Sequence, residues 1–261
     1  MPANRPYSLL ACYYDELTRG APRMNRLARK KVLGRILPRI RTVCDLGCGT
    51  GTAAIELARR GLTVYALDLS PEMVLRARRK VRRLPPRLRA RIAVRRADIR
   101  RFRLPEPVDL VLSQFNPINH LPRKTDLGRA FRAVARALRP GGWFCFDVNT
   151  RRTYAQIYSL TRWEEKPGFC LVYRGRFFPR RDKAWLDLEW FIRDGAAWQR
   201  HRERIEDTCW SDAEIRRALR RAGFRRIRHW DGTEVRPPSP YQKRGMDAYY
   251  LAQKPAQGSQ R

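Results

Sequence analysis

Hydrophobic and polar residues follow one another along the first 150 residues in a pattern that predicts strands and helices in turn. Short apolar runs typical of buried strands lie at residues 42–44, 62–67, 92–94, 108–112 and 143–148. The helix after the second run has Ser70 as N-cap, Pro71 at its first position, and Met73, Ala77 and Val81 on one buried face. Strands that alternate with helices predict a parallel sheet with helical crossovers.

The pattern changes after residue 150. Segments 171–173, 185–190 and 198–204 are rich in aromatic residues and alternate with period two, and Asp194-Gly195 is a hairpin-turn dipeptide. These features predict an antiparallel β meander. Helical spacing resumes where Ser211 and Glu214 form a capping box, and the last strands are expected at residues 225–230 and 248–251.

The sequence therefore predicts an α/β fold, namely a doubly wound, Rossmann-like, mostly parallel seven-stranded sheet with an antiparallel β insertion between the fifth and sixth strands. Its 261 residues suit one enlarged domain. We expect an N-terminal helical segment packing on the core, the core itself, a β-rich lid insertion, a C-terminal completion of the core and a disordered tail. The corresponding ranges are 1–38, 39–150, 151–210, 211–254 and 255–261.

The charge of the chain is strongly positive, with a net value of +32 and 57 basic residues, of which eight are lysine and 49 are arginine. Such an excess can neutralise the phosphates of a nucleic acid. In the last predicted helix, however, Arg216, Arg217, Arg220 and Arg221 lie opposite an apolar face, as solvated helices require. A denser arginine series at 87–103 flanks the predicted edge strand, where charge also discourages strand pairing. A solvated surface and a nucleic-acid face both stay open.

Cysteine usage and hydropathy bear on the location of the protein. Six cysteines are scattered without a C-x-x-C pair, so neither a disulfide nor a metal site is predicted. No apolar stretch approaches the ~18 residues of a membrane span, and the N-terminus lacks the apolar segment of a signal peptide. We expect a cytoplasmic protein with no membrane partner, and the sequence leaves the oligomeric state open.

The stretch with the clearest chemical meaning is Asp-Leu-Gly-Cys-Gly-Thr-Gly at residues 45–51, between the first strand and the following helix. Its glycines lack the Cβ atoms that would keep a ligand from the backbone, and free N–H groups of the helix point into the same crevice. The spacing differs from the G-x-G-x-x-G of dinucleotide-binding loops. Asp68 closes the second strand, where a carboxylate can accept both hydroxyls of a ribose. The sequence therefore predicts a nucleoside cofactor.

Together with Leu138-Arg139-Pro140-Gly141-Gly142 before the fifth strand, this stretch resembles the class I S-adenosylmethionine-dependent methyltransferases over roughly residues 40–150. The resemblance implies methyl transfer with S-adenosyl-L-methionine as cofactor and S-adenosyl-L-homocysteine as product. Small-molecule members often carry a β-rich lid at the position of the insertion. This implies a small-molecule methyl acceptor that is methylated at nitrogen or oxygen by in-line displacement.

The resemblance also assigns cofactor contacts. It places a tyrosine of the N-terminal Tyr-Asp-x-Leu segment at the methionine end, with packing on the sheet as the alternative, and an acid after the third strand near the adenine. The implied cofactor-binding residues are Tyr14, Asp45, Gly47, Gly49, Asp68, Leu69, Asp98, Ile99, Ser113 and Gln114.

Catalytic candidates lie in the segment 116–121, after the fourth strand. Its Asn-Pro start is similar to the D/N-P-P-Y/F motif of base amino methylases, but Ile118 replaces the second proline. The segment is closer to the Asn-His-Leu turn of the small-molecule subgroup. This implies His120 as a general base, with Asn119 beside it, whereas a local hydrogen bond is the alternative role for a lone histidine.

Two other functions stay open from the sequence. The arginine-rich surface is compatible with an RNA or DNA methyltransferase. A binding or assembly module with degraded chemistry is the third possibility, and the intact glycine loop argues against it.

Overall fold

The core is one seven-stranded sheet in the order β10-β11-β5-β4-β1-β2-β3, in a computed structural model that describes residues 5–236 and 243–256. Strand β11 runs antiparallel to both its neighbours, and the other pairings are parallel. The strands are β1 (Thr42–Leu46), β2 (Thr63–Asp68), β3 (Ile92–Arg96), β4 (Val108–Ser113), β5 (Leu138–Asn149), β10 (Arg225–Asp231) and β11 (Asp247–Gln253). The predicted fold class is confirmed. The predicted disordered tail lies, from residue 257 on, outside the described residues.

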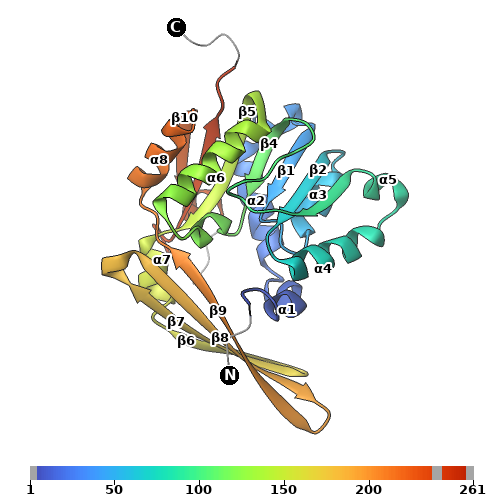
Figure 1. Ribbon diagram of the computed structural model, residues 1–261, viewed down its shortest axis with the longest axis vertical. Coiled ribbons are helices and arrows are strands. Elements are labelled where there is room, and N and C mark those ends of the chain that lie inside the picture. Colours follow the sequence, from blue (N-terminus) through green and yellow to red (C-terminus); the bar gives the residue numbers. More distant parts are fainter. Residues whose placement is uncertain (1–4, 237–242, 257–261) are drawn as a thin grey trace.

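Helices cover both faces of this sheet (Figure 1). Helices α6 (Lys124–Ala137) and α8 (Asp212–Arg221) pack on one face, while α2 (Ala21–Leu33) and α3 (Thr52–Arg59) pack on the other. Successive residues of a strand enter opposite layers, as strand geometry requires. The shorter helices are α1 (Leu10–Leu17), α4 (Pro71–Arg82), α5 (Pro86–Arg89), α7 (Arg151–Ile157) and α9 (Gly232–Val235).

Helix starts follow the local sequence signals. The Ser70 hydroxyl accepts a hydrogen bond from the Met73 N–H at the start of α4. At the start of α8, Ser211 and Glu214 form both hydrogen bonds of the predicted capping box. These caps satisfy N–H groups that have no partner within a helix.

The insertion, residues 151–210, forms a separate four-stranded antiparallel sheet in the order β6-β7-β8-β9. Figure 1 shows its long hairpins projecting from the core, and the apolar residues of its inner face, such as Leu171, Leu188 and Trp190, pack against α1. The predicted meander and its turn at Gly195 (φ 60°) are confirmed. The strands are β6 (Thr161–Lys166), β7 (Phe169–Phe178), β8 (Lys183–Asp194) and β9 (Ala197–Thr208).

Gly141 and Gly142, which the sequence places in a turn before the fifth strand, lie inside β5. Val108 pairs with Leu138 and Leu110 with Trp143, so the residues between them form an irregularity in the strand. The Gly141 N–H donates to the carbonyl oxygens of residues 254 and 255, which keeps this stretch tied to its neighbours. The sequence also gave no indication of α7 or β6. Among the described residues, no helix is long and apolar enough to cross a membrane.

Candidate active site

The loop between β1 and α3 has the backbone that its glycine spacing predicts. Gly47, Gly49 and Gly51 have φ values of 78°, 54° and 80°, which side chains of L residues rarely allow. The Gly47 N–H donates to the Leu67 carbonyl oxygen and the Gly49 N–H to Asp68 Oδ2, each at 2.8 Å. The loop is therefore fastened to the end of β2.

A cavity of about 430 Å³ lies beside this loop and is also lined by α1, by α2 and by the segment after β4. The predicted cofactor residues that line it are Tyr14, Asp45, Gly47, Gly49 and Gln114. Those that lie outside its lining are Asp68, Leu69, Asp98, Ile99 and Ser113.

Three buried oxygens of residues that line the cavity lack a hydrogen-bond donor among the described residues. They are Asp45 Oδ2, Asn25 Oδ1 and Glu56 Oε1, and the last of them faces the guanidinium groups of Arg26 at 3.9 Å and Arg60 at 3.6 Å. Burial raises the pKa of Asp45 to about 7, although the charge of Arg29 acts in the opposite direction. A ligand group that carries several N–H donors, such as an ammonium group, fits this position.

Arg29 is a cavity residue that the sequence analysis missed. Its guanidinium donates from Nη1 to Gln114 Oε1 at 2.6 Å and from Nη2 to Glu56 Oε2 at 2.7 Å, and the residue is 5% exposed. Its position on the face of α2 that buries Ala28, Val32 and Leu33 was a readable signal, because a buried arginine requires partners.

Asp68 and Leu69 mark the end of β2. The Asp68 carboxylate accepts from the Gly49 N–H through Oδ2 and from the Ser70 N–H at 2.9 Å through Oδ1. Burial raises its pKa, and these two N–H groups oppose the rise. Each oxygen has a second lone pair for a ribose hydroxyl. Leu69 is 56% exposed, which leaves an apolar surface next to the carboxylate.

The remaining predicted cofactor residues, Asp98, Ile99 and Ser113, lie in three different environments. Asp98 accepts three N–H groups of Arg100, and the hydrogen bonds from that side chain lower the pKa of Asp98. Ile99 packs against the hydrophobic core, and Ser113 is fully buried with an unpartnered hydroxyl. Contact of Asp98 with an adenine stays a prediction.

His120 lies in a short 3-10 helix, residues 117–120, that follows β4. Its Nε2 is 2.8 Å from the Tyr7 hydroxyl, and its Nδ1 is 2.7 Å from Asp207 Oδ1 on β9 of the insertion. Burial is the largest influence and acts to lower the pKa of His120, but the Asp207 carboxylate, the Glu206 backbone and the Asp68 charge together outweigh it, so the pKa is raised. The predicted candidate thus has partners from the N-terminal segment and from the insertion, neither of which the sequence identified.

Asn119 is held by the backbone of two strands. Its amide nitrogen donates to the carbonyl oxygens of Asn149 at 3.1 Å and Thr208 at 2.9 Å, and its oxygen accepts from the Asn149 N–H at 3.0 Å. The residue is fully buried. Asn119 therefore ties the His120 turn to β5 and β9, and a catalytic role for it stays a prediction.

Phe115 and Asn116, the second and third residues after β4, are in the left-handed region, with φ values of 70° and 66°. Strain of this kind is common at functional sites. Asp147 at the end of β5 accepts from the Asn116 N–H at 3.1 Å and so holds the turn. As a result Phe115 faces the Tyr14 ring edge-on across the cavity, with centroids 6.3 Å apart.

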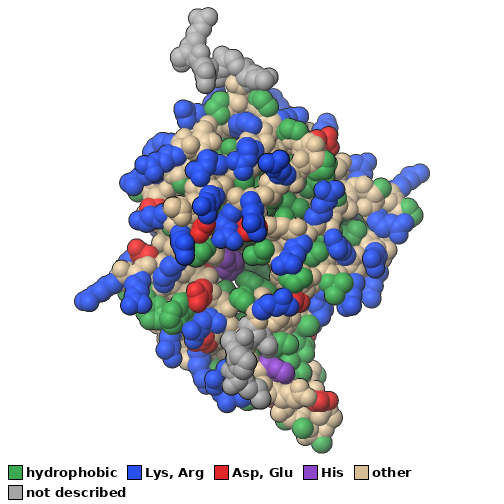
Figure 2. Space-filling view, viewed as in Figure 1, with side chains coloured by type: hydrophobic (Ala, Val, Ile, Leu, Met, Phe, Trp, Pro, Cys, Tyr) green, Lys and Arg blue, Asp and Glu red, His purple; other side chains and the backbone are tan. Residues whose placement is uncertain are grey.

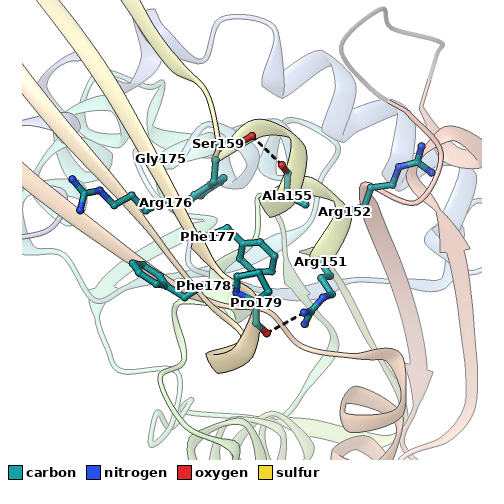
Figure 3. A pocket seen from close by; sticks show the side chains of 10 residues that line it. Arg151, Arg152, Ala155, Ser159, Gly175, Arg176, Phe177, Phe178 and Pro179 are labelled. Atoms are coloured by element: carbon teal, nitrogen blue, oxygen red, sulfur yellow. Dashed lines mark hydrogen bonds between the residues drawn. The ribbon is translucent and has the colours of Figure 1, made fainter.

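A second, open hollow of about 930 Å³ lies between α7 and β7. Figure 3 shows its wall, where the Arg151 guanidinium donates to the Pro179 carbonyl oxygen and faces the Phe177 ring. It contains none of the predicted site residues. The described residues show no cluster of three or more His, Cys, Asp or Glu side chains that would hold a metal ion.

Comparison with known proteins identifies the kind of domain that contains this site. Residues 43–142, which contain the glycine loop, match the family described as methyltransferase domain. The chain carries a methyltransferase domain and is an S-adenosylmethionine-dependent methyltransferase.

Relatives of this methyltransferase match between 40% and 84% of its length. A putative methyltransferase, YqeM, of Bacillus subtilis is 29% identical over 221 residues, which is 84% of this chain and 86% of that protein. The magnesium-protoporphyrin O-methyltransferase of Rhodobacter capsulatus is 29% identical over 149 residues, 54% of each chain. A dTDP-3-amino-3,4,6-trideoxy-alpha-D-glucopyranose N,N-dimethyltransferase of Streptomyces venezuelae is 31% identical over 40% of this chain and 41% of its own.

Solved structures share the fold of the methyltransferase including its insertion. An S-adenosylmethionine-dependent methyltransferase from Clostridium acetobutylicum has a TM-score of 0.76 at 23% identity and covers 96% of this chain and 99% of its own. A sugar N-methyltransferase from Streptoalloteichus has a TM-score of 0.68 at 24% identity, and the match covers 93% of this chain and 92% of that protein. S-adenosyl-L-methionine is the cofactor, and the unpartnered Asp45 and Asn25 oxygens fit its ammonium group.

Proposed function

We propose that this methyltransferase methylates a nitrogen or oxygen of a small molecule bound between the core and the insertion, beside His120. The observation that carries the proposal is the contact of Asp207, on the insertion, with His120, on the core. This contact supports a site to which both the insertion and the core contribute. Relatives named as a sugar N-methyltransferase and an amino-sugar N,N-dimethyltransferase support a small acceptor. The cytoplasmic location expected from the sequence stays a prediction.

We assign the cofactor contacts by matching groups of opposite character. Asp45 and Asn25 accept from the ammonium group, while Arg29 pairs with the carboxylate at the same end of the cofactor. Asp68 accepts from the ribose hydroxyls, and the exposed Leu69 lies against the adenine. Of the ten contacts implied by the resemblance, we retain Asp45, Asp68 and Leu69. We also retain the four residues that line the cavity, namely Tyr14, Gly47, Gly49 and Gln114.

Methyl transfer from this cofactor does not require a covalent intermediate with the protein. The bound cofactor supplies a methyl group that its sulfonium sulfur already activates. The chain therefore has to orient the acceptor and exclude water, and orientation alone can contribute roughly 7–11 kcal/mol of barrier lowering. A base near His120 matters most when the acceptor is a hydroxyl group, because a neutral amine is already nucleophilic.

The Asp68→Ala variant tests the cofactor assignment. We expect S-adenosyl-L-homocysteine to bind at least tenfold more weakly to this variant by calorimetry, because two ribose hydroxyls lose a charged acceptor. Asp194→Ala, which removes a carboxylate from the exposed β8–β9 hairpin, is the matched control and should bind as the wild type does. Equal affinity of Asp68→Ala and wild type would contradict the role of Asp68.

The acceptor class is tested by transfer of radiolabelled methyl groups from S-adenosyl-L-methionine into a cell extract. We expect label in the small-molecule fraction. Label in a nuclease-sensitive polymer would instead favour RNA or DNA methylation. One observation speaks for that second candidate, since no acidic residue lies between Glu72 and Asp98 while α4, α5 and β3 display many arginines.

A further inference from the structure

We propose that Tyr7, rather than His120, receives the proton of the methyl acceptor, and that strand β9 of the insertion positions Tyr7 and His120 for this through Glu203 and Asp207. The inference rests on the proposed function, since it concerns the proton released when the acceptor is methylated. Tyr7 is the catalytic residue in this scheme. His120 takes the proton that Tyr7 gives up, and the two carboxylates of β9 are positioning residues.

Both ring nitrogens of His120 are already engaged. Nδ1 faces the Asp207 carboxylate at 2.7 Å, and Nε2 faces the Tyr7 hydroxyl at 2.8 Å. A carboxylate only accepts, so the neutral ring carries its hydrogen on Nδ1 and leaves the Nε2 lone pair to accept from the Tyr7 O–H. A methyl acceptor would have to displace Tyr7 to reach Nε2. The Tyr7 hydroxyl therefore shields Nε2, and the proposal places the acceptor against this hydroxyl.

Tyr7 is held in place by an unusual backbone. Its φ value is 63°, a left-handed conformation that costs energy for an aromatic residue and persists only where the surroundings impose it. The next three residues all donate to the Glu203 carboxylate. The donors are the Ser8 hydroxyl at 3.0 Å, the Leu9 N–H at 2.8 Å and the Leu10 N–H at 2.9 Å.

Strand β9 holds both partners of the Tyr7–His120 hydrogen bond. Glu203 and Asp207 are four residues apart, so they share one face of the strand, and they are 1% and 3% exposed. The Trp190 N–H also donates to Glu203, at 3.0 Å, and the Tyr158 hydroxyl donates to Asp207 Oδ2 at 2.8 Å. Glu203, through its hydrogen bonds, and Asp207, through its 2.7 Å contact with His120 Nδ1, thus hold the N-terminal segment and the His120 turn to one strand.

In the proposed step, methyl transfer is accompanied by two proton transfers. The acceptor nucleophile bonds to the methyl carbon, and the carbon–sulfur bond breaks with its electron pair kept by sulfur. The acceptor proton passes to the Tyr7 oxygen while the Tyr7 proton passes to His120 Nε2. Burial raises the pKa of Tyr7, so the two transfers occur together and no free phenolate forms. The imidazolium is stabilised by Asp207, and it later loses its proton to water.

Histidine NMR on the full chain tests the geometry without cofactor or acceptor. The chain has three histidines, so His201 and His229 serve as internal references. We expect His120 to carry its hydrogen on Nδ1 when neutral, and Tyr7→Phe to shift its Nε2 resonance. Tyr13→Phe, which removes a hydroxyl from the neighbouring helix α1, should leave that resonance unchanged. A hydrogen on Nε2 in the wild type would overturn the proposal.

The pH dependence of His120 follows from the groups that face it. These are Asp207 from β9, Asp68 from the end of β2 and the Tyr7 hydroxyl, with Tyr158 behind Asp207. Asp207→Asn removes the largest influence that raises the His120 pKa, so we expect that pKa to fall. The limb of the rate profile that rises with pH should move to lower pH with it. An unchanged His120 pKa would contradict the positioning role of Asp207.

The activity arm uses radiolabelled methyl transfer into the small-molecule fraction of an extract. We expect Tyr7→Phe to lower the rate at least tenfold and to leave S-adenosyl-L-homocysteine affinity within twofold of wild type. Tyr13→Phe is the control for rate and thermal stability. A wild type that neither binds the product nor transfers label would overturn the proposed function itself. Normal binding with an unaffected rate in Tyr7→Phe would overturn only the role of Tyr7.

Discussion

At the residue scale, we expect Asp45, the acceptor that we propose for the ammonium group of the cofactor, to lower the stability of the protein without cofactor. Burial raises its pKa to about 7, so the folded state keeps a proton that the unfolded chain releases near pH 4. Its contribution to the free energy of unfolding therefore falls as pH rises from about 4 to about 7. Asp45→Asn should be more stable than wild type at pH 8, and the difference should shrink toward pH 5.

Urea unfolding of both proteins between pH 5 and pH 8 measures this difference. Asp98→Asn is the control of opposite sign, because Arg100 lowers the pKa of Asp98 and that carboxylate stabilises the fold only while it is charged. We expect Asp98→Asn to be less stable than wild type at pH 8. A constant difference between Asp45→Asn and wild type at all pH values would refute the assignment.

Single residues were predictable where their signal is local. The glycine loop and Asp45 were found because a strand, a turn and a helix follow one another within a few residues. Arg29 was missed, since its partners Gln114 and Glu56 lie 85 and 27 residues away. The bond from Tyr7 to His120 spans 113 residues and left no trace in the pattern. Pairings of this length depend on the whole fold.

At the element scale, the contact between β7 and the segment after α7 leaves no room for a side chain. A Cβ on Gly175 would lie 2.4 Å from the Tyr158 carbonyl oxygen and 2.5 Å from its Cα. Both atoms belong to the backbone, so no rotation of a side chain relieves the clash. We expect Gly175→Ala to lower the free energy of unfolding by about 1–3 kcal/mol.

Urea denaturation checks this value, with Gly20→Ala as the matched control. Gly20 has φ −78° and nothing within 4 Å of its virtual Cβ, so that variant should keep or slightly raise the stability. Because Tyr158 donates to Asp207, Gly175→Ala should also disturb the His120 resonance in NMR spectra. Equal stability of the two variants would show that β7 can shift away from the segment after α7 at no cost.

Elements were predictable where the hydrophobic pattern is strong. The core strands and the long strands of the insertion were found by their periodicity. Strand β6 was missed because it is largely polar and charged, and it becomes a strand by pairing with β7 from Thr161 opposite Arg174 to Lys166 opposite Phe169. Helix α7 is only seven residues long, and its N-cap Thr150 accepts from the Arg152 N–H. Tertiary contacts complete both elements.

At the scale of the whole molecule, the fold alone does not explain the net charge of +32. Figure 2 shows Lys and Arg side chains spread over most of the face in view rather than gathered into one track. Arginines lie on α4 and α5 at one edge of the sheet and on α8 near the other. A dispersed charge of this kind binds polyanions without specificity.

We therefore expect weak binding of a fluorescent duplex DNA that falls steeply with salt and has no preferred surface. Replacing Arg79, Arg83 and Arg87 by Gln removes three charges from α4 and α5, and replacing Arg217, Arg220 and Arg221 by Gln removes three from α8. If binding is dispersed, both variants reduce the slope of log affinity against log salt equally. A track on α4 and α5 would lower the slope in the first variant alone, by up to about 3 units. The two variants carry the same net charge, so they differ only in where the charges were removed. An unequal loss of slope would favour a nucleic-acid substrate over a small molecule.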